Sequence, residues 1–183
     1  AHVSKHWESL NYLGKPDIQK AFSEYEAFEQ VFKDNGTELL YLPEDASVNM
    51  DSIYCRDAAI ATSKGMIICN MGKEGRKNEP LAEQKAFEAN GIPVLGVITA
   101  PGTIEGGDVA WLDEKTLAVG HTYRTNEEGI QQITAILAPI GVEVITVPMP
   151  HYRGPSDVFH LMSVLSPVDK NLAVVYSPLI PIV

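Results

Sequence analysis

Apolar runs and polar turns recur along the chain at a period of about 50 residues. Two short apolar runs flank a polar turn in 53–70, 108–120 and 160–176, and each segment predicts a β-hairpin. After the first two hairpins the apolar residues take up the spacing of a helix and then form one short run. The chain therefore repeats the order hairpin, helix, strand.

Helix boundaries follow from proline, asparagine and glycine. A first helix is expected over 16–35, where Asn35-Gly36 forms its stop. Two further helices are expected to begin at the caps Asn78 and Asn126 and to end at Gly91 and Gly141. Single strands are expected over 37–43, 93–98 and 142–147.

These elements predict an α/β fold built of ββαβ repeats. A four-stranded propeller blade at this period contains no helix, so a ring of α/β units fits the pattern better. A third helix is due after the last hairpin, but Pro178 and Pro181 make 177–183 a poor helix interior. We expect 1–183 to be one domain, an incomplete ring, with 1–36 as a helical segment leading into it.

Composition limits the classes of partner. A formal net charge of −10 leaves no basic stripe for phosphates, so we expect no nucleic acid. No apolar run approaches the roughly 18 residues that cross a bilayer, and the N-terminus has no signal-peptide pattern. We expect no membrane contact and a cytoplasmic location. Open sheet edges of a partial ring would favour homo-oligomers.

Cysteines and histidines give no metal-ligand pattern. Cys55 and Cys69 are too few for a disulfide framework and lack zinc-ligand spacing; we expect both to be buried and inert. The histidines show no ligand spacing with carboxylates or cysteines. The sequence therefore predicts neither a catalytic metal nor a cofactor.

Three polar residues recur at almost equal steps, at Asp57, Asp108 and His160. Asp57 and His160 are embedded in apolar runs that predict strands, where each needs a partner. In a ring of repeats, equivalent positions surround one axis. We expect these side chains to lie within roughly 10 Å of a common point, the scale of a small-molecule pocket. The alternative is that they only pair with each other.

Residues near two predicted helix starts and in one loop extend this candidate site. Arg76 and Arg124 each lie two residues before a capping asparagine, where a guanidinium and first-turn amides together suit a carboxylate ligand. The alternative is two surface arginines. In Glu105-Gly106-Gly107-Asp108, the glycines permit positive φ or close backbone approach, so both carboxylates can be presented at a strand mouth. The alternative is an ordinary turn.

Five ordered motifs resemble a known family. DSIYCRD, GKEGRKNEP, IEGGDV, VGHTYRTNEEG and VFHLMS are similar to motifs of the guanidino-group-modifying enzymes of the pentein fold, especially dimethylarginine dimethylaminohydrolases and arginine deiminases. The resemblance runs from roughly residue 38 to the end. It implies a five-unit α/β propeller, of which about three units are present here. Arg56 is closer to the deiminases and Met162 to the methylarginine hydrolases, so arginine and methylarginine both stay open as substrates.

The resemblance also implies roles around a substrate guanidinium. Asp57 and Asp108 would hold the guanidinium, and Glu105 would orient His160, the general acid and base. Hydrolysis through a covalent thiouronium on a cysteine would yield citrulline. An amidinotransferase that uses the same intermediate, or a guanidine-binding module without activity, are the alternatives.

At the amino-acid end of the substrate, the resemblance implies that Arg76 and Arg124 grip the carboxylate and Asp51 faces the α-amino group. The family's nucleophilic cysteine belongs to a later unit, and neither Cys55 nor Cys69 matches its position. We therefore expect a hydrolase as the full-length protein, and no catalysis by these 183 residues alone.

Overall fold

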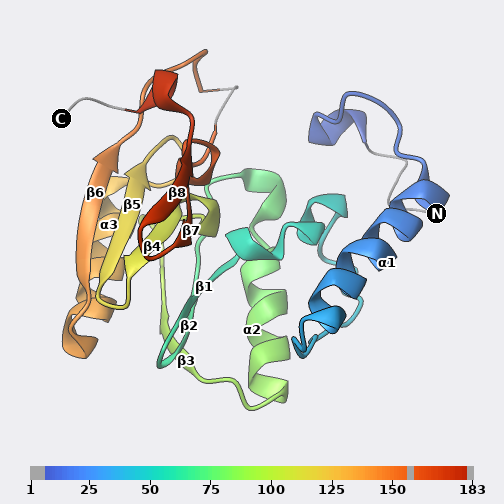
Figure 1. Cartoon of the computed structure of the whole chain (residues 1–183), viewed down its shortest axis with the longest axis horizontal. Coiled ribbons are helices and arrows are strands. Elements are labelled where there is room, and N and C mark those ends of the chain that lie inside the picture. Colours follow the sequence, from blue (N-terminus) through green and yellow to red (C-terminus); the bar gives the residue numbers. More distant parts are fainter. Residues whose placement is uncertain (1–6, 156–158, 181–183) are drawn as a thin grey trace. The chain divides into compact units, whose positions relative to one another are not determined.

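The computed structural model describes residues 7–155 and 159–180. The chain divides into two compact units, Ala1–Ile53 and Tyr54–Val183, and each is described by itself. Figure 1 shows the elements of both units coloured along the sequence. The second unit contains all of the strands found in the described residues.

The N-terminal unit is built around α1 (Ile18–Asp34), which confirms the first predicted helix. The side chain of Asp17 caps it by accepting hydrogen bonds from the amides of Gln19 and Lys20, both at 3.1 Å. Two 3-10 helices, Glu8–Leu10 and Met50–Ile53, complete the regular structure described here. The strand predicted over 37–43 is wrong, because no sheet includes these residues and a strand needs a partner for its backbone groups.

The first repeat of the second unit is a three-stranded sheet with one helix. Strands β1 (Ala59–Thr62) and β2 (Gly65–Ile68) form the predicted hairpin, and β3 (Val94–Val97) runs parallel to β2. Helix α2 (Glu79–Ala89) connects β2 to β3. The 3-10 helix Glu74–Arg76 precedes α2.

The second repeat has the same order. Strands β4 (Val109–Asp113) and β5 (Thr116–His121) pair antiparallel, and β6 (Glu143–Pro148) runs parallel to β5. Helix α3 (Glu127–Leu137) connects β5 to β6 and lies against this sheet (Figure 1), followed by the 3-10 helix Ala138–Ile140. The predicted order hairpin, helix, strand is thus confirmed twice, and the fold is mixed α/β.

A third hairpin closes the described chain. Strands β7 (Leu165–Asp169) and β8 (Leu172–Val175) pair antiparallel, and the 3-10 helix Ser177–Leu179 follows. The apolar side chains of β8 are exposed, whereas β5 buries Leu117 and Val119 completely. The difference follows from the neighbours, because β5 has a strand on each side and β8 has one among the described residues.

The helix ends agree with the sequence, with one exception at a cap. Asn126 caps α3 by accepting a hydrogen bond from the amide of Gly129 at 2.9 Å. Asn78 occupies the equivalent position before α2, but its side chain makes no capping hydrogen bond. Gly91 and Gly141 follow the helices with φ of 71° and 76°, a conformation that glycine adopts without strain.

Asp57 and His160 do not lie in strands, which corrects the sequence prediction. A 3-10 helix precedes each hairpin, namely Cys55–Asp57, Gly106–Asp108 and Leu161–Ser163. Asp57 and Asp108 end their 3-10 helices, whereas His160 is the cap before its own. In this register the equivalent of His160 is Glu105, the cap of the second 3-10 helix. The step from Asp57 to Asp108 therefore follows the structural register, whereas the step from Asp108 to His160 does not.

One apolar core joins the first two repeats. It includes Ile67 from β2, Val119 from β5 and Ile133 from α3, each fully buried. Polar contacts also connect the two hairpins, since the Trp111 indole donates to the carbonyl of Ala61 at 3.1 Å. This shared core includes Ala58 and Val109, next to the first two of the 3-10 helices that precede the hairpins, whereas Leu161 of the third packs in a second cluster with Ala110, Ala118 and Val164.

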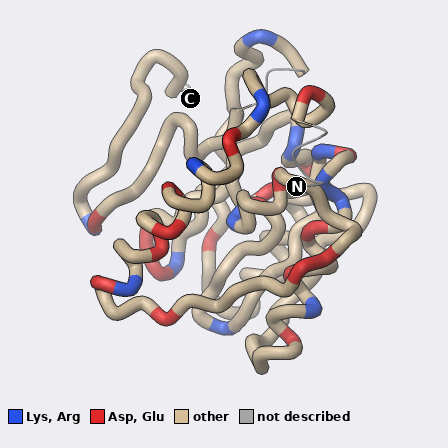
Figure 2. Tube along the Cα trace, turned by 90° about the vertical axis from the view of Figure 1, so that its right-hand side faces the viewer, with Lys and Arg blue, Asp and Glu red and all other residues tan. Residues whose placement is uncertain are grey.

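The distribution of charged residues and the apolar content of the helices both bear on the classes of partner. Lysines and arginines alternate with acidic residues along the trace in Figure 2, with no long basic run. Within 7–155 and 159–180, no helix has both the length and the apolar content that a membrane span requires.

Candidate functional site

Three carboxylates surround the imidazole of His160. Nδ1 of His160 lies 3.3 Å from Oδ1 of Asp108, and Nε2 lies 3.4 Å from Oε2 of Glu105. Nε2 is also 3.9 Å from Oδ1 of Asp57. The prediction that Asp57, Asp108 and His160 meet at a common point is confirmed. The imidazole is 20% exposed and Asp108 and Glu105 are fully buried, so one side of the cluster remains open.

Asp108 is held by the chain around it. Its Oδ2 accepts hydrogen bonds from the hydroxyls of Thr122 at 2.8 Å and Thr125 at 2.7 Å. Its Oδ1 accepts from the amide of Leu161 at 3.1 Å. Both oxygens are therefore occupied by the protein, and the Leu161 amide ties the carboxylate to the residue that follows His160.

The charges around His160 set its protonation. Burial disfavours the imidazolium, but Asp108 beside Nδ1, together with the charges of Asp57 and Glu105, outweighs burial and raises the pKa of His160 above its ordinary value. Nδ1 makes no hydrogen bond of good geometry with the described residues, so Asp108 acts on the ring through its charge. The cluster thus favours a protonated imidazole that can deliver a proton from Nε2.

Asp57 is bound by the guanidinium of Arg76. Nη1 of Arg76 donates to Oδ2 of Asp57 at 2.6 Å, and Nη2 donates to the carbonyl of Tyr54 at 3.1 Å. The other side of the guanidinium donates to Glu79, from Nε to both carboxylate oxygens at 3.0 Å and from Nη2 to Oε2 at 2.7 Å. Arg76 is 4% exposed. Its predicted alternative, a surface arginine, is wrong.

Glu105 is bound by the second predicted arginine. Nη1 of Arg124 donates to Oε2 of Glu105 at 3.1 Å and to Oε1 at 3.3 Å. The amide of Lys73 also donates to Oε1 at 2.9 Å. The side chain of Arg124 is 23% exposed, against 5% for Arg76. The two arginines therefore occupy parallel places, each on one carboxylate beside His160, but only Arg124 has a substantial open face.

The two glycines of the 105–108 loop allow neighbouring residues of the site to approach the loop backbone closely. Neither Gly106 nor Gly107 has positive φ, so that part of the expectation does not apply. A Cβ on Gly107 would stand 2.7 Å from Oδ1 of Asp57 and 2.7 Å from Cγ and Cδ2 of His160. A Cβ on Gly106 would meet the carbonyl oxygen of Arg56 at 2.0 Å. Glycine lets the cluster close around this loop.

The contacts of Glu105 and Asp108 differ from those that their expected roles imply. Glu105 was expected to orient His160, yet it lies at Nε2, the nitrogen on the side of Asp57. Asp108 was expected to hold a guanidinium, yet its oxygens accept from Thr122, Thr125 and Leu161. Asp108 is the residue beside Nδ1, where its charge favours the imidazolium.

The remaining candidates are Asp51 and the two cysteines, Cys55 and Cys69. Asp51 is in the N-terminal unit, in Met50–Ile53, so its contact with an α-amino group stays a prediction. Cys69 is buried, and burial raises the pKa of its thiol well above its ordinary value. Cys55 is exposed, which corrects the expectation of burial. Partial desolvation of its sulfur and the charge of Glu83 still raise its pKa, which disfavours a reactive thiolate.

Asp57, Glu105 and His160 also form a group of possible metal ligands. One ligand atom from each lies within 4.8 Å of the others. Spacing along the sequence did not reveal this group, because the three residues come from different repeats. The raised pKa of His160 favours the imidazolium, which cannot ligate a metal.

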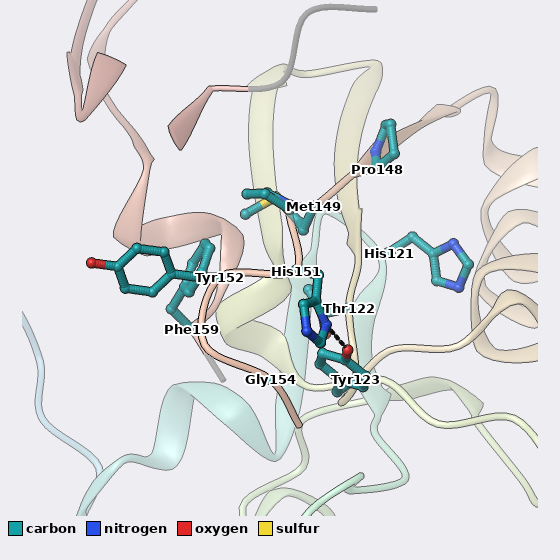
Figure 3. Close-up of a pocket in the computed structure, with 10 residues that line it drawn as sticks. His121, Thr122, Tyr123, Pro148, Met149, His151, Tyr152, Gly154 and Phe159 are labelled. Atoms are coloured by element: carbon teal, nitrogen blue, oxygen red, sulfur yellow. Dashed lines mark hydrogen bonds between the residues drawn. The ribbon is translucent and has the colours of Figure 1, made fainter. Parts of the chain in front are cut away.

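A cavity of about 340 Å³ lies beside the cluster. It is lined by His121 at the end of β5 with Thr122 and Tyr123 after it, by Pro148 at the end of β6 with residues of the loop that follows, and by Phe159. In Figure 3 the hydroxyl of Tyr123 meets Nδ1 of His151 at the centre of the view. None of the seven predicted site residues lines this cavity.

Sequence reasoning missed three polar residues of the site, namely Thr122, Thr125 and Glu79, and it also missed the burial of Glu83. Thr122 and Thr125 support Asp108, and Glu79 and Glu83 on α2 are buried at 2% and 4% exposure. Glutamates in the first turns of a helix look like ordinary surface residues in sequence. Their spacing of four, with Ala86 and Pro80 nearby, was the available sign that they share the inner face of α2.

A protein-family model described as N,N dimethylarginine dimethylhydrolase, eukaryotic, matches residues 3–182. Among curated proteins, the chain is 30% identical over 165 residues to N(G),N(G)-dimethylarginine dimethylaminohydrolase of Streptomyces coelicolor. It is 29% identical over 161 residues to the protein of the same name from Pseudomonas aeruginosa. The alignments cover 90% and 88% of this chain, and 60% of each relative.

Solved structures show the same likeness. A dimethylarginine dimethylaminohydrolase adduct with S-methyl-L-thiocitrulline matches 90% of this chain and 62% of its own, with 29% identity and a TM-score of 0.76. The N-terminal domain of ArgZ, an arginine dihydrolase from cyanobacteria, has a TM-score of 0.79 but only 18% identity, and so shows the fold alone. The chain spans about 60% of the length of the curated relatives named above. With a family model that matches it almost from end to end, the chain belongs to the N,N-dimethylarginine dimethylhydrolase family.

Proposed function

We propose that the protein carrying this chain hydrolyses a C–N bond in the guanidino group of arginine or an N-methylated arginine, with citrulline as product. The observation that supports it most is the position of Nε2 of His160 between Oδ1 of Asp57 and Oε2 of Glu105, at 3.9 and 3.4 Å. Two carboxylates and one acid–base group at one point suit a planar cation. Family membership points to the same chemistry.

In this proposal Asp57 and Glu105 bind the guanidinium, and Asp108 holds His160. The capacity to bind a guanidinium is supported by the chain's own arginines, since Asp57 accepts from Arg76 and Glu105 from Arg124. Oδ1 of Asp57 faces His160, while Oδ2 is taken by Arg76. A substrate would use the oxygens on the His160 side.

The proposed reaction has two steps. A cysteine thiolate attacks the guanidinium carbon, and His160 gives a proton to the departing nitrogen as the C–N bond breaks. Water then attacks the resulting thiouronium carbon. The imidazole accepts the proton of that water, the C–S bond breaks, and citrulline and the thiolate are released. The raised pKa of His160 supports its role as the acid of the first step.

The nucleophile is proposed to come from outside residues 1–183. Cys69 is buried, and the pKa values of both thiols are raised. We also propose that the repeats belong to a five-unit propeller whose remaining units complete the site. The coverage of about 60% of each curated relative supports this.

At the amino-acid end of the substrate, we prefer one of the two arginines as the ligand of the carboxylate. Arg124 is the better carboxylate ligand, because its side chain is 23% exposed whereas that of Arg76 is 5% exposed and saturated by Asp57, Glu79 and Tyr54. Arg76 is then proposed to hold Asp57. Asp51 remains proposed for the α-amino group.

Product analysis tests the function. The full gene product that carries this chain is incubated with arginine or dimethylarginine, with and without a primary amine acceptor such as glycine. Hydrolysis predicts citrulline with equimolar ammonia or dimethylamine in both conditions. An amidinotransferase would instead give an amidinated acceptor and ornithine. Arginine binding without any product would favour a guanidine-binding module.

A further inference from the structure

The carboxylate of Glu79 has no role in the proposed reaction, but it binds Arg76, which in turn binds Asp57 of the site. It accepts three hydrogen bonds from Arg76, two from Nε at 3.0 Å and one from Nη2 at 2.7 Å. Arg76 in turn donates from Nη1 to Asp57 at 2.6 Å. A continuous series of contacts therefore runs from Glu79 through Arg76 to Asp57, and from there to His160 at 3.9 Å.

The geometry fixes the direction in which the guanidinium points. A guanidinium is planar, and its donors form a rigid fork. Glu79 binds the Nε and Nη2 edge of Arg76, so the remaining Nη1 corner faces Asp57. Glu79 is the first residue of α2, where the helix N-terminus favours a negative charge. Its position is therefore set by the helix and not by a flexible loop.

Glu79, Arg76 and Asp57 are all buried, so the loss of a charge on one of them strongly affects the other two. Glu79 is 2% exposed, Arg76 4% and Asp57 7%. Burial disfavours the charged guanidinium, but Glu79 and Asp57 outweigh it and raise the pKa of Arg76. If Glu79 lost its charge, Arg76 would keep Asp57 and the Tyr54 carbonyl as acceptors, but its Nε and Nη2 edge would lose the paired carboxylate and keep one neutral oxygen as acceptor.

Resting on the proposed function, we propose that Glu79 is a positioning residue that acts through Arg76 to hold Asp57 in the orientation that binds the substrate guanidinium. Glu79 touches neither substrate nor the reacting atoms. Loss of its charge should therefore weaken substrate binding more than it slows the chemical steps.

Glu83 provides a matched control on the same helix. It lies one turn after Glu79 and is 4% exposed. Its burial, followed by the charge of Glu79, raises its pKa to about 8, so at pH 6.5 it carries a proton. Glu83→Gln thus replaces a neutral side chain with a neutral one of the same size, whereas Glu79→Gln removes a charge.

The test compares steady-state kinetics of wild type, Glu79→Gln, Glu79→Asp and Glu83→Gln at pH 6.5 in the full gene product. We expect Glu79→Gln to raise KM about tenfold, a loss of ~1.4 kcal/mol in binding, with kcat changed less than about threefold. Glu79→Asp, which keeps the charge, should recover most of the affinity. Glu83→Gln should match wild type.

A second measurement does not depend on activity. The Nε–H resonance of Arg76, observed by NMR, should be protected from solvent exchange in wild type and in Glu83→Gln, and lose that protection in Glu79→Gln. If wild type yields no citrulline, the proposed function fails, and only this resonance decides whether Glu79 holds Arg76. An active wild type with an unchanged KM in Glu79→Gln would overturn the inference and leave the function standing. Retained protection in Glu79→Gln would overturn it as well.

Discussion

Gly107 lies directly against His160, so that a Cβ at residue 107 would stand 2.7 Å from two atoms of the imidazole. The same Cβ would be 2.7 Å from Oδ1 of Asp57. Real Cβ contacts are essentially never this short. The backbone of the 105–108 loop is thus part of the site, since it sets how closely Asp57 and His160 approach.

Gly107→Ala should therefore separate Asp57 from His160. We expect arginine or dimethylarginine to bind at least about tenfold more weakly, and overpacking to lower the free energy of unfolding by about 1–3 kcal/mol. Isothermal calorimetry and denaturant unfolding of the full gene product measure both effects. Gly14→Ala is the control, because in the described part of the chain no atom other than those of its chain neighbours lies within 4 Å of the added Cβ. Equal affinity in Gly107→Ala and wild type would contradict the packing described here.

Asp108→Asn should lower the pKa of His160. Asp108 is the largest of the influences that favour the imidazolium, and asparagine removes its charge while keeping its size. NMR titration of the His160 ring measures the pKa directly. Asp169→Asn, at the exposed end of β7, is the control. A His160 pKa that stays at its wild-type value in Asp108→Asn would show that Asp108 does not act on the ring.

Glu83 should make stability fall as pH rises. Its pKa is about 8 in the folded chain against an ordinary value of 4.5. A raised folded pKa gives stability that is fully present below pH 4.5 and is lost as pH rises through about 8.

Glu83→Gln has no such proton to lose. Its free energy of unfolding should match wild type near pH 5 and exceed it at pH 8.5 by an amount on the order of a few kcal/mol. Urea unfolding at several pH values measures this difference. Glu88→Gln, an exposed position on the same helix, should show a difference that does not change with pH. A flat difference for Glu83→Gln would mean that Glu83 is ionised throughout.

Chelators should leave citrulline formation unchanged. The raised pKa of His160 favours an imidazolium that cannot ligate a metal, although one ligand atom each of Asp57, Glu105 and His160 lies within 4.8 Å of the others. Activity is compared before and after dialysis against EDTA, and again after added Zn²⁺. Loss of activity on dialysis with recovery on Zn²⁺ would point to a bound metal.

The repeat order was predictable because hairpins and helices carry different apolar periods. Local residues such as Asn126 and Gly141 mark the ends of the helices. Short apolar runs and polar turns indicate the three hairpins and the two parallel strands in the same way. The strand expected over 37–43 failed because an apolar run does not reveal whether a partner strand exists.

The candidate site was predictable in its members and less so in its contacts. Asp57, Glu105 and His160 were identified from motifs, but which nitrogen each carboxylate faces depends on the 3-10 helices that precede the hairpins. Glu79 was missed because its burial arises from packing of α2 onto the first sheet. The spacing of four between Glu79 and Glu83 places both on one face of α2, but it does not show that this face is buried.

The most direct test of the central claim is kcat/KM for citrulline formation by Asp57→Asn in the full gene product. Asp57→Asn removes the charge that is proposed to bind the guanidinium, and a hydrogen bond to a charged group contributes about 1.5–3 kcal/mol. We predict a fall of about 100-fold relative to wild type, with Asp169→Asn unchanged. A value for Asp57→Asn within twofold of an active wild type would contradict guanidinium binding at this site.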